Sequence, residues 1–206
     1  MNPYSVKEQF CFHFKDNLYR YIIIFASCIL AVAVGIYLAV CGFSYSSLLT
    51  SADKNLFGYI SGTAEYGSIF WSRFLSLLLC LVLIFCFNIV RETAFLNYAY
   101  LAYQMCLVVL SSSAIISLYG LSGILNVIFF VAPINIINFL ILSFVSVVSM
   151  ERASYAKKFR VGFFASFKEC SYWKKFLLCF VIIFILCAIY SFVLPLLLKS
   201  FVIVNY

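Results

Sequence analysis

The side chains able to do chemistry are few and lie far apart along the chain. The triplet Ser111–Ser113 offers hydroxyl nucleophiles, but it lies within an apolar segment. A serine nucleophile needs a neighbouring base, and the one histidine, His13, lies near the N-terminus. We therefore interpret these serines as small residues at helix contacts and expect the protein not to be an enzyme.

The cysteines also lack the spacing of a reactive or metal-binding set. The chain has nine cysteines and no C-x-x-C pair, the spacing that zinc and redox sites use. Six of them lie inside apolar runs, where a thiol behaves as a small hydrophobic group. These are Cys28, Cys80, Cys86, Cys106, Cys179 and Cys187. We expect no metal site and no cofactor.

The composition is that of an integral membrane protein. Hydrophobic residues make up 66% of the 206 residues, charged residues 10%, and the mean hydropathy is +1.12. A soluble domain carries roughly 25% charged residues, so this chain could not cover its surface with polar side chains. No polar block is long enough for a separate soluble domain, and residues 1–206 are predicted to form one membrane domain.

Apolar segments of bilayer-spanning length predict an all-α, polytopic membrane helix bundle. A helix needs about 20 apolar residues to cross the hydrocarbon core. The expected spans are residues 21–43, 74–90, 98–118, 121–150 and 176–198.

The basic residues predict the orientation of these spans. Three Lys or Arg precede the first span, one lies between the second and third, and seven lie between the fourth and fifth. Thus 11 of the 14 fall on one side, which the positive-inside rule makes cytoplasmic. The N-terminus is then cytoplasmic and the C-terminus extracytoplasmic, as expected for a multi-pass protein of the cell membrane.

The fourth expected span is too long for a straight crossing. Its 30 residues would reach roughly 45 Å, against a core of about 30 Å. Pro133 lacks a backbone donor and should kink or break the helix. Asn135 and Asn138, three residues apart, should share a helix face and bond across to another helix. The alternative is a broken helix whose ends bind an ion or a substrate, as in transporters.

Ionisable residues are expected only at the edges of the spans. Arg91 and Glu92 lie at the end of one span, and Glu151 and Arg152 at the end of another. We interpret all four as exposed interfacial anchors. Ionisable groups within the membrane usually mark proton relays and ion sites, so the pattern argues against an ion-coupled transporter.

The outer loop, residues 44–73, is the first candidate surface for recognition. It combines a few charges with many aromatic residues. Aromatic residues at this level often form an interfacial belt, and a partner-binding surface is the alternative. The candidate partner residues are Tyr59, Glu65, Tyr66 and Trp71.

The inner loop, residues 151–175, is predicted to form a basic amphipathic helix on the membrane. Aromatic residues repeat every four positions from Tyr155 to Phe167. The basic residues are Lys157, Lys158, Arg160, Lys168, Lys174 and Lys175. Membrane lipid is the expected partner, with a docked cytoplasmic protein as the alternative. Nucleic acid is not expected, because these cations suit anionic lipid.

Residues 119–149, YGLSGILNVIFFVAPINIINFLILSFVSVVS, resemble the signature of the stage II sporulation protein M family. The matching features are Gly120 and Gly123, an apolar run, and Pro133 followed by Asn135. The first span, with Gly35 near its outer end, is also similar. The chain departs from the family at Ile134, where members usually carry glutamine, and it lacks their glycines and proline between spans two and three.

The resemblance implies a non-enzymatic membrane scaffold. Such a protein assembles peptidoglycan-degrading partners, such as stage II sporulation proteins D and P, during engulfment or envelope remodelling. A homo-oligomer is left open. The alternative function is the membrane subunit of a transporter or permease, including the ABC type, partnered by a cytoplasmic ATPase.

Overall fold

The computed structural model describes residues 13–41, 66–89, 93–160 and 172–193, and these parts are almost entirely helical. Five described helical segments are long and apolar enough to cross a membrane, and no strand occurs among the described residues. The predicted all-α, polytopic membrane bundle is therefore confirmed. Its elements are α2 (Leu18–Val40), α4 (Tyr66–Phe87), α5 (Leu96–Asn126), η2 (Val127–Val131), α6 (Ala132–Phe159), α8 (Tyr172–Ala188) and η3 (Ile189–Val193).

The outward surface of the helices is as apolar as the core. On α2, Ile29 and Leu30 are exposed, as is Leu79 on α4. A helix that is hydrophobic all round suits the interior of a bilayer rather than water. Since lipid offers no hydrogen bonds, a helix also satisfies the backbone where an open strand would not.

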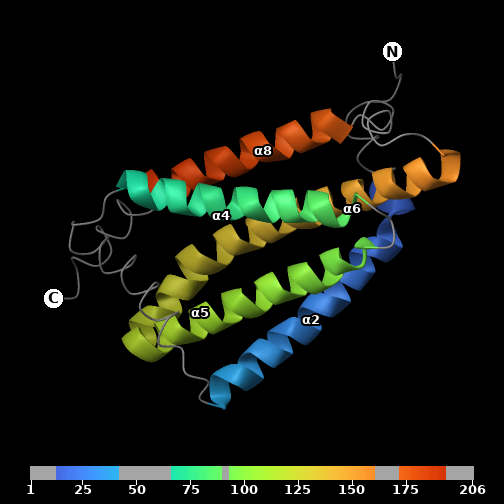
Figure 1. Cartoon of the computed structure of the whole chain (residues 1–206). Coiled ribbons are helices and arrows are strands. Elements are labelled where there is room, and N and C mark those ends of the chain that lie inside the picture. Colours follow the sequence, from blue (N-terminus) through green and yellow to red (C-terminus); the bar gives the residue numbers. More distant parts are fainter. Residues whose placement is uncertain (1–12, 42–65, 90–92, 161–171, 194–206) are drawn as a thin grey trace.

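Successive helices run in alternating directions, as single crossings require (Figure 1). Helix α2 packs along α5, α4 lies beside α8, and α6 passes between the two pairs. The α2–α5 approach is close, because a Cβ on Gly35 would lie only 3.0 Å from Cβ of Val109. Glycine at this position lets the two helices meet.

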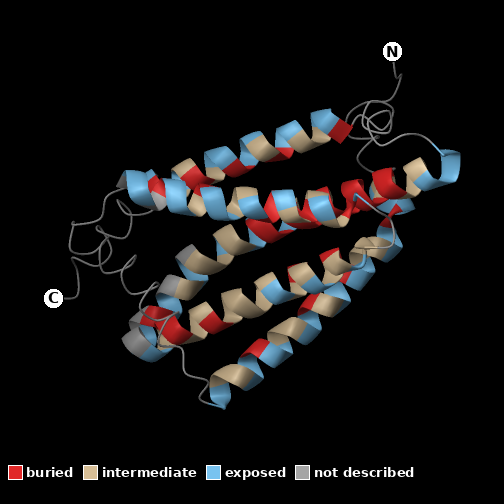
Figure 2. Cartoon of the chain, in the orientation of Figure 1, coloured by how far each residue is buried: buried red, intermediate tan, exposed pale blue. Residues whose placement is uncertain are grey.

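Helix α6 is the central element of the core. The long buried stretch from Val145 to Met150 lies on this helix, as Figure 2 shows in red. Leu81 of α4, Ile24 of α2 and Ile183 of α8 belong to the same core cluster. Residues that contact three neighbouring helices cannot also face lipid, which explains why α6 is the most buried helix.

The chain turns back between α5 and α6 at Gly120. Its backbone angles, φ 57° and ψ −127°, lie in a region that essentially only glycine adopts. Gly123 allows the returning segment to pass close by, because a Cβ there would lie 2.6 Å from the carbonyl oxygen of Ile115. Both glycines thus have a structural role, and residues 121–126 belong to the returning segment.

The expected irregularity at Pro133 takes the form of a π-helical turn. Residues 127–131 form η2, and α6 resumes the α-helical pattern at Ala132. Proline has no N–H to donate to the preceding turn. The widened register directly before Pro133 accommodates that missing donor.

Two expected boundaries differ most from the structure. Helix α4 begins at Tyr66 rather than at Phe74, so residues 66–73 of the expected outer loop are helical. Helix α6 continues through Glu151 to Phe159, so this part of the expected inner loop prolongs a span and is not a separate surface helix. Hydropathy alone ends a span at its first charge, whereas the helix continues until Arg160, whose φ of 51° closes it.

Candidate functional site

A partly open cavity of about 150 Å³ lies between α4, α5 and α6. Much of its lining is apolar, from residues such as Leu101 and Phe139, but polar side chains from all three helices also line it. The polar lining residues are Arg73, Ser76, Gln104, Asn135 and Asn138. A polar cavity of this size accommodates several waters or one small molecule.

Arg73 brings a positive charge to this cavity. Its Nη2 donates a hydrogen bond of 2.7 Å to the hydroxyl of Tyr190, and its guanidinium carbon lies 4.0 Å from the centre of that ring. Arg73 lies in the first turn of the membrane span Phe70–Phe87, at the edge of a span, where ionisable residues are expected. Arg73 is the eighth residue of α4, roughly 10 Å from the start of that helix.

The two asparagines singled out in the sequence both line the cavity, but Asn135 does not bond across helices as expected. Its Nδ2 donates to the carbonyl oxygen of Val131, one turn earlier, at 2.9 Å. That carbonyl lies four residues earlier, which is within reach of a short polar side chain on a helix. Asn138 is 8% exposed, and its Oδ1 accepts no hydrogen bond from any described residue.

Gln104 was not singled out from the sequence. Its Nε2 donates to the hydroxyl of Tyr100 at 3.0 Å, and that hydroxyl donates to Sγ of Cys80 at 3.0 Å. A lone amide in the middle of an apolar span is the signal that could have found it, because such a group needs a partner in lipid. The pair Tyr100 and Cys80 joins α5 to α4.

Arg152, unlike the half-buried Arg73, is fully buried inside the bundle. It is 1% exposed, and its Nη2 donates to the backbone carbonyl of Asn88 at 2.6 Å. Its guanidinium also lies 5.5 Å from the centre of the Tyr172 ring. The interpretation of Arg152 as an exposed interfacial anchor is therefore wrong: it joins α6 to the end of α4 and to the start of α8.

A second contact reinforces this junction. The hydroxyls of Ser149 on α6 and Tyr172 on α8 lie 2.8 Å apart and share a hydrogen bond. Both residues are buried. Together with Arg152, this bond fixes three helices at one end of the bundle.

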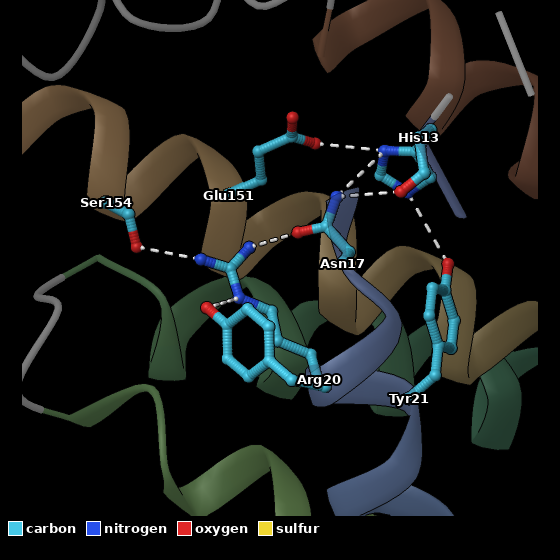
Figure 3. Close-up of polar contacts among 7 residues, drawn as sticks. His13, Asn17, Arg20, Tyr21, Glu151 and Ser154 are labelled. Atoms are coloured by element: carbon cyan, nitrogen blue, oxygen red, sulfur yellow. Dashed lines mark hydrogen bonds and ion pairs between the residues drawn. The ribbon is translucent and has the colours of Figure 1, made fainter. Parts of the chain in front are cut away.

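Figure 3 shows a polar junction between the chain before α2 and the end of α6. His13 Nδ1 lies 3.1 Å from a carboxylate oxygen of Glu151, and Asn17 donates to the carbonyl oxygen of His13 at 3.0 Å. Arg20 donates to Oδ1 of Asn17 at 2.7 Å and to the hydroxyl of Ser154 at 3.2 Å. Glu151, whose side chain is 43% exposed, is thus the partner of His13 at this end of the bundle.

The same end of the bundle carries the exposed cations. Lys157, Lys158 and Arg160 are exposed at the end of α6, and Lys174 is exposed near the start of α8, with Lys175 half-buried beside it. We call this the basic end. Lys168, Arg91 and Glu92 lie outside the described residues.

The opposite end of the bundle carries the described part of the candidate partner surface that was expected in the outer loop. Trp71 is 56% exposed on α4, with its ring against Phe70 and Phe74. Tyr59 and Glu65 lie outside the described residues, and Tyr66 begins α4 with a side chain that is not described. Trp71 is thus the one member of this candidate set whose side chain is placed.

These arrangements define the class of the protein. The described residues form a multi-pass α-helical membrane protein, with a partly open polar cavity between α4, α5 and α6 and a hydrogen-bonded junction at the basic end. Among the described residues, no group of three or more His, Cys, Asp or Glu could hold a metal ion.

Comparison with known proteins does not assign this membrane protein to a family. No protein-family model matches the chain, and neither a curated protein nor a solved structure does.

Proposed function

We propose that this protein is a non-enzymatic membrane scaffold that assembles peptidoglycan-degrading enzymes, in the manner of stage II sporulation protein M. The observation that carries the proposal is the junction made by Arg152. A buried arginine bonded to a backbone carbonyl of α4 and stacked near Tyr172 of α8 fixes three helices relative to one another. A rigid arrangement of this kind suits a protein whose task is to hold partners in place.

The resemblance over residues 119–149 supports the proposal further. Gly120 and Gly123, which the family also carries, have a physical reason here: the first permits the reversal and the second the close return. In the proposed orientation the basic end faces the cytoplasm, where its cations meet anionic lipid. Partners that degrade peptidoglycan then approach from the opposite end.

Affinity purification of the tagged protein from native membranes tests this function. We expect peptidoglycan-degrading enzymes among the co-purified proteins. A matched variant replaces residues 44–65 by a Gly/Ser segment of equal length, and we expect it to lose those enzymes while still inserting in the membrane. Recovery of a cytoplasmic ATPase in place of wall-degrading enzymes would overturn the scaffold.

The second candidate is the membrane subunit of a transporter, and the polar cavity is the observation that favours it. Polar or charged side chains lining a cavity inside a bundle are typical of substrate pathways. For this function, the same purification should recover an ATPase, and its recovery should survive replacement of residues 44–65 but not removal of the cations of the basic end.

A further inference from the structure

We propose that the cavity between α4, α5 and α6 binds a small organic acid that carries a hydroxyl or amino group beside its carboxylate. This site goes beyond scaffolding, and it does not depend on which proteins assemble on the chain. The proposal rests on the charge, the free hydrogen-bonding groups and the size of the cavity.

The charge of the cavity favours an anion. Arg73 supplies a guanidinium, and among the described residues no carboxylate lies within ion-pairing distance of it. Tyr190 provides a hydrogen bond and a ring face, but neither carries a full negative charge. Arg73 is half-buried at the cavity, and a guanidinium binds a carboxylate through two parallel hydrogen bonds.

The amide side chains favour a ligand that also donates hydrogen bonds. Asn138 is more than nine-tenths buried, and its Oδ1 accepts no hydrogen bond from any described residue. Gln104 and Asn135 each donate from their amide nitrogen to the protein, at 3.0 and 2.9 Å. A buried amide oxygen without a donor costs about 1–3 kcal/mol, and a ligand hydroxyl or ammonium would remove that cost.

Two π-helical turns hold the polar groups in place. Tyr190, which anchors Arg73, belongs to η3, and the Val131 carbonyl that anchors Asn135 belongs to η2. Single π-helical turns occur often at functional sites. Here each turn supplies one hydrogen-bond partner to a polar side chain that lines the cavity.

The size of the cavity limits the ligand. About 150 Å³ is the volume of an engineered cavity that holds benzene. A three-carbon acid such as lactate or alanine is of this order, whereas a nucleotide or a sugar phosphate is not. Lactate and alanine share the carboxylate and differ in the donor, and both serve as probes.

Isothermal titration of the purified full-length protein in detergent and chloride-free buffer tests the site. The probes are L-lactate, L-alanine, acetate and inorganic phosphate. We expect lactate or alanine to bind at one site per chain, and acetate to bind more weakly because it lacks the second donor. Arg73→Gln should weaken this binding roughly tenfold or more, and Lys157→Gln at the basic end should leave it unchanged.

Two further variants keep the test decisive. Arg73→Lys retains the charge and should bind measurably if Arg73→Gln fails to fold. Asn138→Leu should weaken lactate or alanine more than acetate, because it removes an acceptor for the donor group. The proposal is overturned if neither acid binds the wild type, if Arg73→Gln binds as well as the wild type, or if phosphate binds more tightly than both acids.

Discussion

At the scale of single residues, two arginines determine the polar contacts of the bundle: Arg152 is buried and Arg73 is half-buried. Arg152 joins three helices through a backbone carbonyl and an aromatic ring, while Arg73 stacks on Tyr190 beside the cavity. Both lie near the ends of apolar runs, so hydropathy assigned them to the membrane surface. Their burial depends on which helix ends meet, and a single sequence does not contain that information.

The structure predicts that Arg152→Met destabilises the protein. The substitution leaves the buried carbonyl of Asn88 without its donor, which costs about 1–3 kcal/mol. Thermal unfolding of the purified protein in detergent measures the change. Lys157→Met, at an exposed site of the same helix, is the matched control and should cost little. Equal melting temperatures for the two variants would contradict the role of Arg152.

At the scale of elements, the hairpin of α5 and α6 is where sequence and structure agree best. The expected spans 98–118 and 121–150 placed the turn at residues 119–120, and the overlength of the fourth span with Pro133 predicted a kink or a break. The structure has a reversal at Gly120 and a π-helical turn before Pro133. A missing backbone donor and a backbone angle allowed only to glycine are local effects, and local effects can be predicted from sequence.

Side-chain partners at the same elements were harder to predict. Asn135 was expected to bond across helices, but its amide donates to the carbonyl of Val131, four residues earlier in the chain. The cavity itself could not be foreseen, since Gln104, Arg73 and Asn138 meet only because α4, α5 and α6 converge. The helical period of a sequence predicts on which face of its helix a residue lies. It does not predict which other helix packs against that face.

The hairpin makes a prediction that compares two glycines. Gly123→Ala should destabilise the protein by about 1–3 kcal/mol, because the new Cβ would lie 2.6 Å from the carbonyl oxygen of Ile115. Gly67→Ala is the matched control. Nothing lies within 4 Å of the Cβ that this substitution adds, and alanine favours the helix. Thermal unfolding should rank Gly123→Ala well below Gly67→Ala, and the reverse order would refute the close return.

At the scale of the whole molecule, the two ends of the bundle differ in chemistry. The basic end combines the exposed cations with the junction of His13, Arg20 and Glu151 (Figure 3). The opposite end presents Trp71 and the reversal at Gly120. Such asymmetry gives the molecule two distinct surfaces, and the proposed scaffold uses the non-basic one for its wall-degrading partners.

The most direct test of the scaffold is photo-crosslinking in intact cells from the two tryptophan positions. Trp71 is 56% exposed and Trp173 is 59% exposed, and they lie near opposite ends of the bundle, at the starts of α4 and α8. A photoreactive residue at position 71 should crosslink to a peptidoglycan-degrading enzyme, and one at position 173 should not. Crosslinks from position 173 to an ATPase, with no protein captured at position 71, would contradict the scaffold.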